Sequence, residues 1–218
     1  YSAIECIIFP SSLTDLKEGW CQDMPYINKI VVKPNNPIYQ SYEDKFILGK
    51  SKPEKNFFDV LVFSIRNIVT ETVPDFIEII GPFAFERCEE LKTIKFSEDS
   101  CLKIIEKYAF LNSSIEKFSL PIHVTRICQS AFLGCLMLET IEIPFNSELK
   151  TIEEYAFSYS SIENITIPTS LVDLKKGWCQ DTQKLNKILV MPNNPCYQSY
   201  EDKFILGKSK LESDSFDV

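Results

Sequence analysis

Residues 16–51 read LKEGWCQDMPYINKIVVKPNNPIYQSYEDKFILGKS, and residues 174–209 read LKKGWCQDTQKLNKILVMPNNPCYQSYEDKFILGKS. The two copies lie 158 residues apart and are identical at 28 of 36 positions. The match extends over residues 1–60 and 159–218, so the chain begins and ends at different points of one large repeating unit. Self-similarity at a fixed period is the sequence signature of a tandem array. We therefore expect a single elongated domain over residues 1–218, and we expect it to be a piece of a longer array.

A shorter motif recurs between the two copies. Ala-Phe pairs occupy residues 84–85, 109–110, 131–132 and 156–157, and six or seven residues after each Ala an apolar-x-x-apolar-x-apolar segment begins. The alternation at the end of each segment predicts a short strand. A unit of 23 or 24 residues with this pattern falls within the range of leucine-rich repeats. The segments begin near residues 4, 27, 68, 91, 115, 138, 162 and 185.

These repeats predict an α/β leucine-rich-repeat solenoid, because one rung cannot bury its apolar side until its neighbours stack on it. We expect short parallel strands on one face, each paired with the next, and turns or short helices carrying Ala-Phe on the other. Two inserted β-hairpins are expected, from Ile38 to Lys50 and again after Asn194. Trp20 and Trp178 stand where other rungs have Ala, each followed by Cys where they have Phe, which we interpret as a volume-conserving exchange in the core.

Two motifs carry a family resemblance. The rung at Ile115 reads I-E-K-F-S-L-P and continues with apolar residues up to Ala131, Phe132 and Cys135, while the long rung carries N-P-I-Y-Q-S from Asn36. Both are similar to the BspA-like leucine-rich repeat of surface proteins from oral and gut bacteria and anaerobic parasitic protists. The resemblance implies a non-enzymatic cell-surface antigen without a cofactor, which meets proteins of host cells, of the matrix or of other microbes. The alternative is an intracellular scaffold that binds a protein partner.

Charge and composition exclude several classes of function. The chain carries a net charge of −8, and nucleic-acid surfaces need clustered Lys and Arg. A hydrophobic content of 44% is enough for a folded core, but no run of 18 apolar residues is present, so this segment is not expected to span a membrane. Oligomeric state is left open by the sequence.

Eight cysteines invite a disulfide interpretation. A disulfide framework would recur with the repeat, yet the scattered residues Cys6, Cys101, Cys128 and Cys196 have no cysteine counterparts in the sister copies. We therefore predict free thiols that act as small apolar residues. The absence of a C-x-x-C pair gives no indication of zinc, and the cysteines do not decide the compartment.

Candidate chemistry is sparse. His123 and Cys128 could be imagined as a cysteine hydrolase, a weak alternative, because a Cys-His site also needs an orienting group and a pocket. The adjacent acids Glu43 and Asp44 are expected in a tight turn rather than at a metal site. N-x-[ST] triplets at Asn112 and Asn164 are possible glycosylation sites in a secreted eukaryotic protein.

An extended strand face is the usual binding surface of a solenoid. The outward positions are mostly Thr, Ser and charged residues. Ile8 and Val31, on adjacent rungs, are apolar exceptions, and Leu189 is apolar at the position that corresponds to Val31. The hairpins are the second candidate, although recent duplication explains their near-identity as easily as function does. The candidate partner surface is Ile8, Lys29, Val31, Tyr39, Tyr42, Phe46, Lys187, Leu189, Tyr197 and Tyr200.

Overall fold

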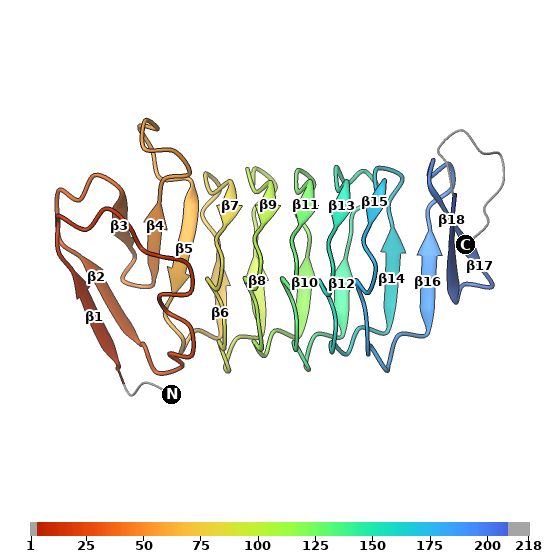
Figure 1. Cartoon of the computed structure of the whole chain (residues 1–218), viewed down its shortest axis with the longest axis horizontal. Coiled ribbons are helices and arrows are strands. Elements are labelled where there is room, and N and C mark those ends of the chain that lie inside the picture. The colour runs from red at the N-terminus through yellow and green to blue at the C-terminus, as the bar shows by residue number, and fades with distance from the viewer. Residues whose placement is uncertain (1–3, 209–218) are drawn as a thin grey trace.

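The computed structural model describes residues 4–208 of the chain as an elongated stack of rungs (Figure 1). Each regular rung supplies one short strand to each of two parallel sheets and then turns tightly into the next rung. The described residues contain no helix, and hence no helix long and apolar enough to cross a membrane. The expected short helices on the second face are therefore absent from this part of the chain. The parallel solenoid and the strand spacing are confirmed.

The predicted strand face is a six-stranded parallel sheet, with each strand starting two residues after the beginning of its repeat. Its inward residues, such as Phe118, are buried between two exposed neighbours, so the predicted alternation is confirmed. The strands are β6 (Thr70–Thr72), β8 (Thr93–Lys95), β10 (Lys117–Ser119), β12 (Thr140–Glu142), β14 (Asn164–Ile167) and β16 (Lys187–Val190).

The second face is an eight-stranded sheet built from the apolar residues that precede each Ala-Phe pair. Its regular strands are only two residues long, but they keep an in-register parallel ladder, as with Ile105 beside Ile80 and Ile127. The strands are β3 (Tyr39–Tyr42), β4 (Phe46–Gly49), β5 (Val60–Ser64), β7 (Ile79–Ile80), β9 (Ile104–Ile105), β11 (Arg126–Ile127), β13 (Thr151–Ile152) and β15 (Asp173–Leu174).

Tight turns, rather than helices, carry the Ala-Phe pairs. The residue before each Ala and the residue four positions further on both have positive φ, for example Tyr108 at 60° and Asn112 at 54°. Positive φ is uncommon outside glycine. Two such residues, four positions apart, bend the backbone sharply around each Ala-Phe pair. Gly177 (71°) and Asp181 (56°) occupy the same two positions around Trp178, which confirms the predicted register of the GWCQD segment.

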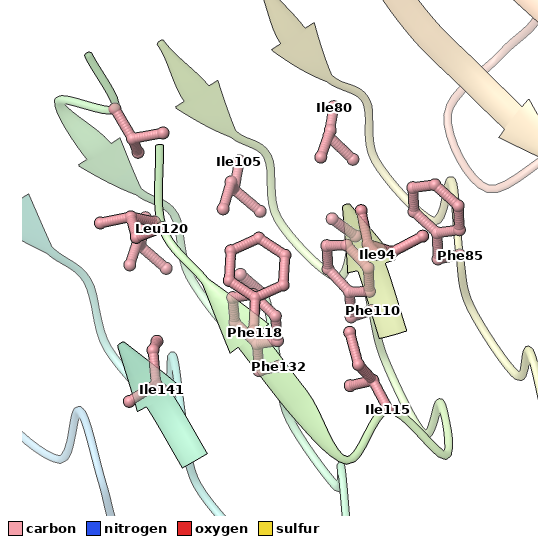
Figure 2. Close-up of a cluster of buried hydrophobic side chains, with 14 of the residues drawn as sticks. Ile80, Phe85, Ile94, Ile105, Phe110, Ile115, Phe118, Leu120, Phe132 and Ile141 are labelled. Atoms are coloured by element: carbon pink, nitrogen blue, oxygen red, sulfur yellow. The ribbon is translucent and has the colours of Figure 1, made fainter. Parts of the chain in front are cut away.

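A ladder of stacked phenylalanines forms the centre of the core (Figure 2). The rings of Phe85, Phe110 and Phe132 lie 4.8 Å apart and almost parallel, and Phe157 continues the stack 5.3 Å beyond Phe132. Phe118, from the opposite sheet, meets two of these rings edge to face. Trp178 ends the ladder with its ring centroid 6.3 Å from Phe157 and is only half-buried, so the large-for-small exchange lies at the core's edge.

The first two rungs depart from the regular stack. Strands β1 (Cys6–Phe9) and β2 (Lys29–Val32) pair with each other in parallel, but within residues 4–208 β2 does not pair with β6. The long rung inserts β3, β4 and β5 between them, and β4 and β5 run antiparallel at the end of the eight-stranded sheet. A second apolar cluster around Ile30 and Phe63 fills this region, so the expected pairing of every strand with the next is wrong here.

A buried asparagine fixes each hairpin to the rung before it. The Asn36 side chain donates to the carbonyls of Pro10 and Leu13 and accepts from the backbone N–H groups of Ile38 and Tyr39. Asn194 makes the matching four bonds before the second hairpin, β17 (Tyr197–Tyr200) and β18 (Phe204–Gly207). The retained N-P-x-Y motif therefore has a structural explanation, because the amide uses both donors and its acceptor oxygen.

Replacement of this asparagine should loosen the hairpin. We expect Asn194→Ala to lower the free energy of unfolding by about 2 kcal/mol, because four groups lose a partner and some stay buried. Urea denaturation of the purified chain measures the effect, with the exposed Gln198→Ala as the control. A loss no larger than that of the control would contradict this role of Asn194.

Candidate functional site

The outward face of the six-stranded sheet is polar and continuous. Side chains of adjacent rungs align in register, as with Lys117 beside Thr140 and Ser119 beside Glu142. The Ser119 hydroxyl donates to the Glu142 carboxylate at 2.6 Å, so the two rungs are also joined across this surface. This face is an ordinary solvated surface with no clustered charge of one sign.

An apolar groove lies where these strands end. One hollow of about 750 Å³ extends along the ends of β8 and β10, and a second of about 490 Å³ extends along β12 and β14. They share Ser119, Leu120 and Pro144, so they form one continuous groove, which we call the strand-end groove. Its accessible apolar lining comes from Phe96, Ile122, Ile143 and Pro144, whereas Ile94, Leu120, Pro121 and Ile141 are buried.

Phe145 stands directly beside the strand-end groove. It lies between Pro144 and Asn146, which both line the groove, and 76% of its surface is exposed. Phe145 was not predicted from the sequence, because a single aromatic residue in a turn does not disturb the repeat pattern. The available signal was its aromatic ring, since the corresponding residues after Pro74, Pro121 and Pro168 are Asp75, Ile122 and Thr169.

The outward residues predicted from the sequence lie in two places. Ile8 is opposite Val31 on the β1–β2 pair, with 59% of Ile8 exposed and Val31 half-buried. Leu189 is exposed at the other end of the molecule, on β16. The neighbouring Lys29 and Lys187 are both exposed. The structure does not bring the two groups together into one surface.

The hairpin aromatics differ between the two copies. Tyr39 and Tyr197 are half-buried, and their hydroxyl oxygens accept the backbone N–H groups of Leu16 and Leu174, so both are structural. Tyr42 packs edge to face against Phe76, whereas its counterpart Tyr200 is exposed. Phe46 is fully buried and cannot form part of a partner surface, which corrects that expectation.

The environment of Cys128 opposes nucleophilic chemistry. Burial, reinforced by the nearby Glu106 and Glu153 carboxylates, raises the pKa of the Cys128 thiol to about 12, and only the thiolate is a strong nucleophile. His123 is exposed, and its Nδ1 lies 3.2 Å from an oxygen of Glu148. The interpretation as a cysteine hydrolase therefore gains no support.

All eight cysteines lie within the described residues and are free thiols. Burial raises the pKa of the Cys135 thiol to about 12, and its Sγ lies 3.0 Å from the carbonyl oxygen of Phe110. Cys6 and Cys101 are exposed, so the expectation of small apolar core residues holds for most of the set but not for these two. Asn112 and Asn164 are both exposed, the latter on the outward face of β14.

The parallel stack, the Ala-Phe turns and the polar strand face define a leucine-rich-repeat solenoid. A family model described as the BspA type leucine-rich repeat region, in six copies, matches residues 58–200. The chain therefore belongs to the BspA-type leucine-rich-repeat family. A comparison with curated proteins gave no match.

Solved structures of bacterial proteins share this fold. The pneumococcal vaccine antigen PcpA is 25% identical, with a TM-score of 0.64 over 79% of this chain and 43% of that chain. A leucine-rich cell-surface protein from Faecalibacterium prausnitzii is 19% identical, with a TM-score of 0.50 over 79% of this chain and 50% of that chain. The match thus spans half or less of the length of each of these proteins.

Proposed function

We propose that the chain is a non-catalytic protein-binding module of a cell-surface antigen and that the strand-end groove is its binding site. The exposed Phe145 beside an apolar groove is the observation that carries the proposal. An apolar surface bordered by polar residues is typical of protein interaction sites, and a rigid aromatic residue is the usual anchor of such a contact. The likeness to a vaccine antigen and to a cell-surface protein supports a position outside the cell.

The groove suits an extended segment of a partner protein. Two residues of the outward strand face, Lys117 and Glu142, can supply charged hydrogen-bond partners. The lining of the strand-end groove supplies apolar contacts. Apolar contacts provide affinity, while polar contacts at the rim fix the orientation. Tight folding of each rung keeps the groove preformed, which lowers the entropic cost of binding.

Substitution of the exposed anchor tests the binding site. We expect Phe145→Asp to reduce binding of the labelled chain to intact host epithelial cells and to a panel of purified matrix proteins more than about tenfold. The stability of the fold should be almost unchanged, because Phe145 is not part of the core. Leu136→Asp is the matched control, since Leu136 is 67% exposed and, unlike those of Phe145, its sequence neighbours Cys135 and Met137 do not line the groove. Equal effects of the two variants, or none, would overturn the site.

The compartment is tested separately with antibodies raised against residues 1–218. Labelling of intact source cells is the expected result. Labelling only after permeabilisation would favour the second candidate, an intracellular scaffold that binds its protein partner in the same groove.

A further inference from the structure

The floor of the strand-end groove is accessible at every second rung. Phe96 and Ile143 line the groove and are half-buried, whereas Leu120 and Ile167, at the corresponding positions of the alternate rungs, are 2% and 0% exposed. Phe96 and Ile143 are 47 residues apart (from 96 to 143), which is the length of two rungs. Neighbouring strands lie about 4.8 Å apart, so the accessible apolar contacts repeat at about 9.6 Å along the groove.

The rim of the groove has the same period. Lys95 and Glu142 occupy corresponding positions two rungs apart, and the uncharged Ser119 lies between them. Both charged side chains are exposed, and within residues 4–208 neither takes part in an ion pair. A ligand that lies along the groove therefore meets a positive group and a negative group about 9.6 Å apart.

The groove crosses strands whose backbone groups are already used. The four strands that end at it, β8, β10, β12 and β14, each pair with a neighbour on both sides. A segment lying across them cannot add to the sheet, and alternate residues of an extended strand, about 6.7 Å apart, match neither one rung nor two. A polyproline II segment needs no backbone partner and repeats every three residues, or about 9.3 Å. Its period is therefore close to that of two rungs.

We propose that the strand-end groove binds a proline-rich segment of its protein partner in the polyproline II conformation, with an acidic and a basic residue three positions apart. The acidic residue pairs with Lys95 and the basic residue with Glu142. The prolines pack on Phe96, Ile143 and the exposed Phe145, because aromatic-lined grooves suit a segment whose backbone is already ordered. This inference rests on the proposed function, since it names the partner of the same groove.

Fluorescence anisotropy with the complete 218-residue chain tests the conformation of the ligand. A fluorescein-labelled peptide with two copies of E-P-P-K-P-P should bind saturably, with one peptide per chain. A peptide with two copies of E-A-A-K-A-A keeps the charges at the same spacing but favours a helix, so it should bind at least about tenfold more weakly. Absence of saturable binding of the proline peptide, or equal or tighter binding of the alanine peptide, would overturn the proposal.

Charge reversal on the rim tests the pairing. The unmodified chain should prefer the E-P-P-K-P-P peptide to a matching E-P-P-E-P-P peptide, and Glu142→Lys should reverse this preference, by about threefold in each direction because exposed ion pairs are weak. Glu90→Lys is the matched control, since Glu90 is also exposed but does not line the groove, and it should keep the original preference. An unchanged preference in Glu142→Lys, or the same change in both variants, would overturn the assigned pairing.

Competition separates this inference from the proposed function. Excess unlabelled E-P-P-K-P-P peptide should displace the chain from intact host epithelial cells, and Phe145→Asp should lose the peptide and the cells together. Loss of cell binding in Phe145→Asp, with a peptide that neither binds nor competes, would overturn the proline-rich partner alone. Retained cell binding in Phe145→Asp would instead overturn the proposed function.

Discussion

Phe132→Ala is expected to lower the free energy of unfolding by about 3–5 kcal/mol. Its ring is fully buried and stacks between Phe110 and Phe157, at centroid distances of 4.8 and 5.3 Å. Phe118 also meets it edge to face at 5.0 Å (Figure 2). The loss is large because the substitution removes the middle of a continuous stack, and the neighbouring rungs, fixed by their own ladders, cannot close the cavity.

Urea denaturation followed by circular dichroism measures this effect. Phe145→Ala is the matched control, because it removes the same ring from an exposed turn, and its cost should stay within about 0.5 kcal/mol. A loss below about 1 kcal/mol for Phe132→Ala would mean that the phenylalanine ladder does not carry the stability of the solenoid.

The period of the sequence predicted the stack of rungs because the same physical requirement, burial against a neighbour, recurs every 23 or 24 residues. The Ala-Phe pairs marked the core correctly for that reason. The second parallel sheet was not predicted, since two-residue strands such as Ile104–Ile105 are too short to show alternation. The turns were not distinguished from short helices either, because positive φ at Tyr108 or Tyr155 leaves no signature in residue type.

The sites where the repeat is interrupted were the least predictable. Equal hairpin sequences suggested equal surroundings, yet Phe46 is buried and Phe204 is exposed, because β5 pairs with β4 whereas, within residues 4–208, β18 pairs with β17 alone. Phe145 and the strand-end groove were missed because they arise from the alignment of several rungs. The buried asparagine, in contrast, could have been suspected from its repetition in both copies of N-P-x-Y.

Arg66 shows how the stack ends at the long rung. In regular rungs the backbone N–H of Phe donates to the Ala carbonyl of the next rung, as from Phe132 to Ala156. The Ala84 carbonyl instead accepts from the backbone of Ser64 and from the Arg66 guanidinium at 2.9 Å. Arg66 is 3% exposed, and its guanidinium also donates to the Phe83 carbonyl. Its side chain thus takes the place of the Ala-Phe turn, which the long rung lacks.

A buried carboxylate accompanies this arginine. Glu86 is 2% exposed, and burial raises its pKa above the ordinary value of 4.5, while the charge of Arg66 opposes that rise. The backbone N–H of Asp23, in the first GWCQD segment, lies 3.5 Å from a Glu86 oxygen. The two buried charges thus hold the first two rungs against the regular stack.

Arg66→Met is expected to lower the free energy of unfolding by about 3–5 kcal/mol at pH 7, because it removes the carbonyl hydrogen bonds of a buried guanidinium and leaves the buried Glu86 with only Arg87, 4.0 Å away, as a nearby positive charge. Arg126→Met is the matched control, since Arg126 forms an exposed ion pair with Glu153 and should cost less than about 1 kcal/mol. Equal losses in the two variants would show that Arg66 has no special role at the joint.

The loss in Arg66→Met should also depend on pH. Because the folded state raises the pKa of Glu86, it binds the proton more tightly than the unfolded state, so this group favours folding at acid pH and loses that effect as pH rises above about 4.5. Without Arg66 the pKa rises further, so the deficit relative to the unmodified chain should be larger at pH 7.5 than near pH 4.5. Addition of Glu86→Gln should recover much of the stability at pH 7.5 and remove the pH dependence, because the glutamine carries no charge to be buried. A deficit that is the same at both pH values, or no recovery in the double variant, would assign the role of Arg66 to its carbonyl hydrogen bonds rather than to its charge.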